Sequence, residues 1–223
     1  MPPGGALPDG VQGGAVFSDD GRFRYWLVRR WDGSLPRCTF VLLNPSAAGA
    51  DADDPTNLRL RAITTALGYG AYELVNLFAR VDTHQDHLLE PDAVGASTAV
   101  ADGWIASAVH RADTVVLGWG DGRSAGAGGR ARRVAVARRA ASVWPLVADH
   151  RPRCLTVNRS GQPGHPLYRP VHSPLLPYRP GAPPRAPAIL HTPTTEGPTV
   201  PHPPDGHPVD HAAATPRPGG GRR

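Results

Sequence analysis

The sequence predicts an α/β fold, specifically a three-layer sandwich with a mostly parallel central sheet. The first observation is a set of short apolar runs, including Thr39–Leu43 and Thr114–Leu117, which are typical of strands buried on both faces of a sheet. The second is that these runs alternate with helical stretches of about 10–15 residues, the pattern of βαβ units. Helices are therefore expected to cover both faces of the sheet.

The first predicted strand is Phe23–Arg30, where aromatic and polar residues alternate before the turn residues Trp31–Gly33. The next strand is Thr39–Leu43. We expect it to end at Asn44–Ser46, because Pro45 cannot continue the hydrogen-bond ladder.

A helix should begin after Asp54, a suitable N-cap residue, with Pro55 in the first helical position. Apolar residues then recur at helical spacing, and Gly68 can close the helix. The run Tyr72–Phe78 predicts the next strand.

The second half of the core repeats this alternation of helix and strand. Its predicted elements are a helix capped by Ser97 or Thr98, a strand at Thr114–Leu117, a helix at Arg130–Trp144 and a strand at Cys154–Val157.

Proline marks where the domain ends. Residues 169–223 hold 15 of the 26 prolines and show neither a helical nor a strand period. Such a segment cannot bury enough apolar surface to offset its ordering entropy. We therefore predict a flexible N-terminus (1–16), one α/β domain (17–168) and a disordered tail (169–223).

The composition excludes several classes of protein. All 24 basic residues are arginine, so neither Schiff-base catalysis nor a Walker phosphate loop is available. No apolar run approaches the ~20 residues of a membrane span, and the N-terminus is unlike a signal peptide. We expect a cytoplasmic protein without membrane attachment, with Cys38 and Cys154 as reduced thiols and with no cofactor or metal.

In parallel sheets, ligands bind beyond the carboxyl ends of the strands. Four polar or glycine-rich segments follow the predicted strands and should meet at one edge: Asn44–Ser46, Asn76–Arg80, Gly118–Gly120 and Asn158–His165. This convergence is the main functional signal in the sequence.

The candidate site residues come from these segments and from the loop before the first helix. Amide and carboxylate groups can orient or activate water, and histidine can donate to a developing anion. The predicted catalytic residues are Asn44, Ser46, Asp53, Asp54 and His165. The predicted ligand-binding residues are Pro45, Arg59, Asn76, Phe78, Arg80, Trp119, Gly120, Gly161 and Pro166. The alternative is structural: Asn44–Ser46 is a turn, Asp54 a helix cap and His165 an exposed loop residue.

Three other patterns suggest further functions. Asp82, His84, Asp86 and His87 resemble a metal cluster, but a solvated loop explains them better. The G-x-S-x-G match around Ser124 suggests a serine hydrolase, although glycine and alanine are abundant there. The arginines of 130–139 are the densest cationic cluster of the core, and they can be simply a solvated helix face.

The ordered motifs resemble those of the bacterial domain-of-unknown-function family 1643. The matching segments are LNPS at 43–46, DDPT at 53–56, NLFAR at 76–80 and GQPGHPLY at 161–168. Asn158 departs from the family, which tends to have threonine there.

The layout is also similar, more remotely, to the uracil-DNA glycosylase superfamily, and this resemblance implies specific roles. Asn44 or a nearby aspartate would hold water, Asn76 would bind the base and His165 would stabilise the leaving anion. The implied function is a nucleobase- or nucleotide-directed hydrolase, with a nucleic acid or nucleotide as its ligand. The alternatives are a non-catalytic module that binds a small ligand or nucleic acid, and a serine hydrolase through Ser124.

Overall fold

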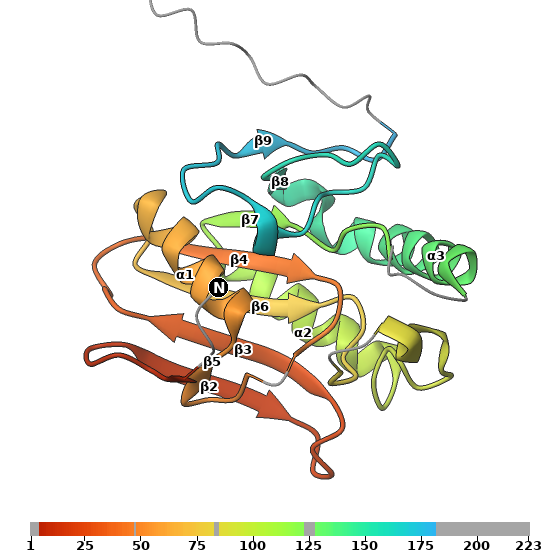
Figure 1. The fold of residues 1–223 in the computed structure, drawn as a ribbon, viewed down its shortest axis with the longest axis horizontal. Helices are drawn as coiled ribbons and strands as arrows, with labels where there is room; N and C mark the ends of the chain where they lie inside the picture. Colours follow the sequence, from red (N-terminus) through yellow and green to blue (C-terminus); the bar gives the residue numbers. More distant parts are fainter. Residues whose placement is uncertain (1–4, 47, 83–84, 123–127, 182–223) are drawn as a thin grey trace, which may run out of the picture. The chain divides into compact units, whose positions relative to one another are not determined.

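The computed structural model describes residues 5–46, 48–82, 85–122 and 128–181, all within the compact unit Met1–Ala186 (Figure 1). The predicted disordered tail lies outside the described residues from position 182 onward.

A seven-stranded sheet forms the centre of the described part of the chain, in the order β2-β3-β6-β4-β7-β8-β9. The four inner strands β6, β4, β7 and β8 are parallel to one another. The strand bounds are β2 Gln12–Phe17, β3 Arg24–Arg30, β4 Arg37–Leu42, β6 Ala71–Asn76, β7 Thr114–Leu117, β8 Arg153–Cys154 and β9 Leu176–Pro177.

The expectation of a mostly parallel sheet was wrong, because the pairs β2–β3, β3–β6 and β8–β9 are antiparallel. The reason lies in the length of the connections. Only residues 31–36 join β3 to β4, whereas a parallel crossover needs a dozen or more residues. The strand β3 therefore runs opposite to the four parallel strands.

Helices cover both faces of the sheet, as predicted. The helix α1 (Pro55–Ala66) lies on one face, and α2 (Thr98–His110) and α3 (Gly129–Val147) lie on the other (Figure 1). The predicted caps are confirmed: the Asp54 and Ser97 side chains accept hydrogen bonds from the first turns of α1 and α2. The described part of the chain also contains three short 3₁₀ helices: η1 (Gln85–Leu89), η2 (Ala148–His150) and η3 (Pro166–Tyr168).

Successive residues of the central strands supply two separate cores. In β4, Phe40 packs with Leu60 of α1, whereas Val41 belongs to the core that contains Ile105 of α2 and Val136 of α3. This alternation follows from the two-residue period of a strand, and it explains the continuous apolar run Thr39–Leu43.

The ordered region extends beyond the limits 17–168 at both ends. The strand β2 pairs with β3, and β1 (Gly5–Ala6) pairs with β5 (Ala52–Asp53). At the other end, β9 pairs with β8. Residues expected to be flexible or disordered thus add backbone hydrogen bonds to the edges of the structure.

Two smaller expectations concern β8 and the cysteines. The strand predicted at Cys154–Val157 is shorter, because after Cys154 only an isolated bridge joins Val157 to Pro163. Cys38 and Cys154 are both buried and unbonded. Among the described residues no helix is long and apolar enough to cross a membrane.

Candidate functional site

A cavity of about 430 Å³ lies at the carboxyl ends of the parallel strands. Its polar lining includes Asn44 and Ser46 after β4, Asn76 at the end of β6, and Asn158 and His165 after β8. The volume falls in the range of small-ligand pockets. The other lining residues are Arg24, Leu42, Leu43, Thr56, Leu74, Asp82, Trp119, Gly120, Asp121, Gly122, Leu167 and Tyr168.

His165 is held in one protonation state. The backbone N–H of Leu167 donates to its Nδ1 at 3.3 Å, which assigns the ring proton to Nε2. Burial lowers the pKa of His165 to about 4, although the nearby Asp54 carboxylate acts in the opposite direction. The imidazole is therefore neutral at physiological pH and presents Nε2–H as a hydrogen-bond donor.

Ser46 and Asp54 form a hydrogen-bonded pair beside the cavity. The Ser46 hydroxyl donates to Oδ2 of Asp54, while Oδ1 of Asp54 accepts from the backbone N–H of Asn57 at 2.7 Å and from its Nδ2 at 3.0 Å. Asp54 is thus the helix cap of the structural interpretation, and it is also bonded to a hydroxyl that lines the cavity. The two interpretations of Asp54 are compatible.

The two asparagines differ in what they leave free. Nδ2 of Asn44 donates to the backbone carbonyl of Asp82 at 2.8 Å, which fixes the amide and leaves its oxygen as an acceptor. Oδ1 of Asn76 accepts from the Arg24 guanidinium at 3.4 Å. Nδ2 of Asn76 has no partner in the described part of the chain, although the residue is only 5% exposed.

Arg24, which was not among the predicted site residues, lines the cavity and is 1% exposed. Its Nη1 donates to the carbonyl of Ala48 at 3.0 Å, and its Nε has no partner among the described residues. Burial lowers the pKa of Arg24 to about 10, so the side chain remains charged at neutral pH. Because β3 is antiparallel to β6, its first residue lies at the edge where the parallel strands end.

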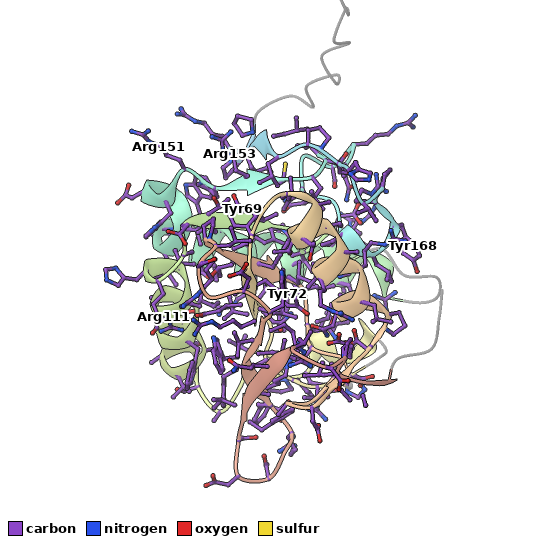
Figure 2. All side chains as sticks on the ribbon, turned by 90° about the vertical axis from the view of Figure 1, so that its left-hand side faces the viewer. Tyr69, Tyr72, Arg111, Arg151, Arg153 and Tyr168 are labelled. Atoms are coloured by element: carbon purple, nitrogen blue, oxygen red, sulfur yellow. The ribbon has the colours of Figure 1, made fainter. Side chains whose placement is uncertain are left out.

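Two loops are tied together on the far side of the cavity. Nε1 of Trp119 donates to Oε1 of Gln162 at 2.7 Å, and the N–H of Gly120 donates to the carbonyl of Pro163 at 2.8 Å. These bonds join the loop after β7 to the loop after β8. Tyr168, which also lines the cavity, is 78% exposed. Figure 2 shows it projecting outward on the side of the molecule opposite Arg111.

The model of the family described as a protein of unknown function, DUF1643, matches residues 24–167 of this chain. The chain belongs to the DUF1643 family. The match begins at Arg24 and ends at Leu167, so it contains every cavity-lining residue except Tyr168. No curated protein and no solved structure matches the chain.

Other predicted site residues of the DUF1643 domain lie away from the cavity lining. Nε of Arg29 donates to the Asp53 carboxylate at 2.8 Å, and Arg61 approaches the same carboxylate at 3.4 Å. Arg80 pairs with Asp92. Asp53 and Arg80 therefore serve in ion pairs within the domain.

The remaining predicted ligand-binding residues hold the walls in place. The Pro45 carbonyl accepts from the N–H of Asp82 at 3.0 Å, and the Gly161 carbonyl accepts from the Tyr178 hydroxyl at 3.0 Å. Pro166 packs against Gly118, where a side chain would collide with the proline ring. The others that do not line the cavity are Phe78, which is in the core, and Arg59 of α1.

Within the described residues of the DUF1643 domain, no group of three or more histidine, cysteine, aspartate or glutamate side chains is arranged to hold a metal. In the loop whose sequence resembles a metal cluster, the Asp82 carboxylate pairs with His87. His84 and the predicted hydrolase serine, Ser124, lie outside the described residues.

Proposed function

We propose that this protein hydrolyses an N-glycosidic bond in a nucleobase-bearing substrate: a nucleoside, a nucleotide or a base in DNA. The observation that carries the proposal is that Asn44, Asn76 and His165 line one cavity. These three residues, on separate segments, correspond to the water, base and leaving-group positions implied by the resemblance to uracil-DNA glycosylases. The proposal would have no basis if these three residues lay on different faces of the sheet.

In the proposed reaction, water attacks the anomeric carbon of the sugar. The oxygen of the Asn44 amide and the Ser46 hydroxyl are the groups that would orient this water. Because Ser46 already donates to Asp54, its oxygen can accept from the water while its own proton moves to the carboxylate. The water thus adds hydroxide to the sugar, the proton that it loses passes to the Ser46 oxygen, and the former hydroxyl proton of Ser46 goes to Asp54.

The carbon–nitrogen bond breaks in the same reaction, and its electron pair leaves with the base. Nε2–H of His165 would donate to the resulting anion, and Nδ2 of Asn76 would donate to an oxygen or nitrogen of the base. A neutral imidazole suits this role. Its N–H group stabilises the anion, and no charged imidazolium has to be removed from water. The depressed pKa of His165 keeps the imidazole neutral and able to donate at working pH.

The test is release of free base by the full chain. Substrates are uracil-, hypoxanthine- and mismatch-containing DNA, together with the corresponding nucleosides and nucleotides. We expect release from at least one substrate, with a loss of about 10²–10³-fold in kcat for His165→Ala. Asn44→Ala should also be strongly impaired.

His150→Ala is the matched control, because His150 is exposed on η2 and does not line the cavity. It should retain full activity. Base release that survives both Asn44→Ala and His165→Ala would disprove the site assignment. Tight binding of a base without any release would show instead a non-catalytic binding module on the same cavity.

A further inference from the structure

The cavity contains a buried positive charge that the proposed reaction does not use. Arg24 is the first residue of β3, lines the cavity and is 1% exposed. Its two described acceptors, the carbonyl of Ala48 and the amide oxygen of Asn76, are both uncharged. The Nε–H group has no partner in the part of the chain that the structure describes.

Two other buried arginines of the domain each pair directly with a carboxylate. Arg29 pairs with Asp53 at 2.8 Å, and Arg139 pairs with Asp102 at 2.6 Å. A buried charge without such a partner is costly in free energy. We therefore expect Arg24 to pair with an anion from outside the chain.

Asn76 adds a second, independent observation. Its Nδ2 is a buried donor without a partner among the described residues, and it lies on the same amide whose oxygen accepts from Arg24. Two neighbouring side chains of the cavity therefore both present unused N–H groups. Buried polar groups are nearly always hydrogen-bonded in folded proteins, so unused donors on two cavity-lining side chains point to a ligand acceptor.

The nearby carboxylates do not fill this role. Asp54 is close enough to favour the charged form of Arg24, but its two oxygens already accept from Ser46 and Asn57. Asp82 and Asp121 also line the cavity, yet both are partly exposed, whereas Arg24 is fully buried. Solvent screens the two partly exposed carboxylates more strongly than it screens the buried guanidinium.

We propose that Arg24, together with one N–H of the Asn76 amide, binds a negatively charged oxygen group of the ligand, a carboxylate or a phosphate, while the other N–H of that amide donates to the base. A guanidinium suits both, since its planar N–H groups match the geometry of either anion. That the ligand carries a base rests on the proposed function, whereas the anion-binding role of Arg24 does not. It narrows the substrate class to bases or nucleotides that carry an anionic group.

The experiment measures binding of matched ligand pairs to the full chain by calorimetry. Orotate and uracil differ by a ring carboxylate, and uridine monophosphate and uridine differ by a phosphate. We expect the anionic member of one pair to bind about 10- to 100-fold more tightly, as for a charge-assisted hydrogen bond. The pair that shows the preference identifies the source of the anion, and inorganic phosphate tests binding of the ion without a base.

Variants then assign the preference to the side chain. Arg24→Gln should abolish the preference, Arg24→Lys should restore part of it, and Arg30→Gln, an exposed position on the same strand, should leave it unchanged. Equal affinities within both pairs, or binding of none of the anionic probes, would overturn the proposal. An unchanged preference for the anionic ligand in a folded Arg24→Gln protein would also overturn it. The affinities of the unmodified protein test the proposal even if this variant does not fold.

The result separates the two proposals. An anion preference without base release would overturn the hydrolase and leave Arg24 as an anion-binding residue. Base release with no anion preference would overturn the role of Arg24 and leave the hydrolase.

Discussion

Two buried arginines of the same strand show how differently one residue type can be used. Arg29 is 0% exposed and satisfied throughout, by the Asp53 carboxylate and by the carbonyls of Val28, Gly49, Ala50 and Ala52. Arg24 is 1% exposed and has two uncharged acceptors and an unpartnered Nε. The first is fully bonded within its own protein, and the second lines a cavity and keeps an unpartnered N–H group.

Because both arginines are buried, burial alone does not tell a structural role from a binding role. The hydrogen-bond and ion-pair partners of each side chain do. Both arginines hold the loop between β4 and α1, since Arg24 bonds Ala48 and Arg29 bonds the residues that follow. Only Arg24 also lines the cavity. The predictions below test this division, in order of decreasing effect on stability.

Replacing Arg29 should have the largest effect. Arg29→Met leaves Asp53 buried with only the more distant Arg61, and it leaves four carbonyls without their donor. We expect the free energy of unfolding to fall by about 3–5 kcal/mol, the usual result of removing one partner of a buried ion pair. Chemical denaturation measures this loss.

Arg30→Met is the control for Arg29→Met, because Arg30 is the exposed neighbour on β3. It should change stability by less than about 0.5 kcal/mol. A loss below about 1 kcal/mol for Arg29→Met would contradict the structural role given to its ion pair.

His165, a half-buried residue of the cavity lining, is kept neutral by the loss of solvent around its ring. Its pKa is lowered from 6.5 to about 4, so between these values the unfolded state binds the proton more readily than the folded state. Stability from this residue is therefore fully present above pH 6.5 and is lost as the pH falls toward 4. The loss amounts to at most about 3 kcal/mol.

His165→Asn removes the titrating group and keeps an acceptor for the N–H of Leu167. Measured by denaturation at several pH values, the unmodified protein should lose stability more steeply than this variant between pH 6.5 and 4. Parallel curves for the two proteins would show that His165 is not held neutral by its surroundings.

The sequence predicted the cavity residues at the ends of the parallel strands and missed the one on the antiparallel strand. Asn44, Ser46, Asn76 and His165, which line the cavity, were predicted because each lies near the end of an apolar run, and the carboxyl ends of parallel strands share one edge. Arg24 is the first residue of a strand, so a rule based on the carboxyl ends of strands does not point to it. The short connection at residues 31–36 was the signal that β3 runs the other way.

Side-chain partners were a second limit of the sequence. Asp53 and Asp54 are adjacent in the chain, yet Asp53 pairs with Arg29 and only Asp54 bonds a cavity residue, Ser46. Nothing in the pattern DDPT distinguishes the two carboxylates, because their directions are set by β3 and α1. The same holds for Arg80, whose pairing with Asp92 depends on how the intervening loop folds.

Replacing Arg24 should have a smaller effect on stability than replacing Arg29. Arg24→Met removes an uncompensated buried charge along with two hydrogen bonds to uncharged acceptors, so the opposing effects nearly cancel. We expect the free energy of unfolding to stay within about 1 kcal/mol of the unmodified protein. A loss as large as that of Arg29→Met would show that the two arginines are equivalent and would remove the basis of the comparison.

The smallest change in stability is expected at Tyr168, which lines the cavity but is 78% exposed. Tyr168→Ala should shift the free energy of unfolding by less than about 0.5 kcal/mol, since a ring so exposed contributes little to the core.

A planar ring at the cavity can stack on a base, an interaction that is worth about 1–3 kcal/mol by alanine substitution. The variant should therefore weaken binding of uridine about 5- to 100-fold, and Tyr168→Phe, which keeps the ring, should bind as the unmodified protein does. Equal weakening in both variants would assign the effect to the hydroxyl, and no weakening in either would place the base away from Tyr168.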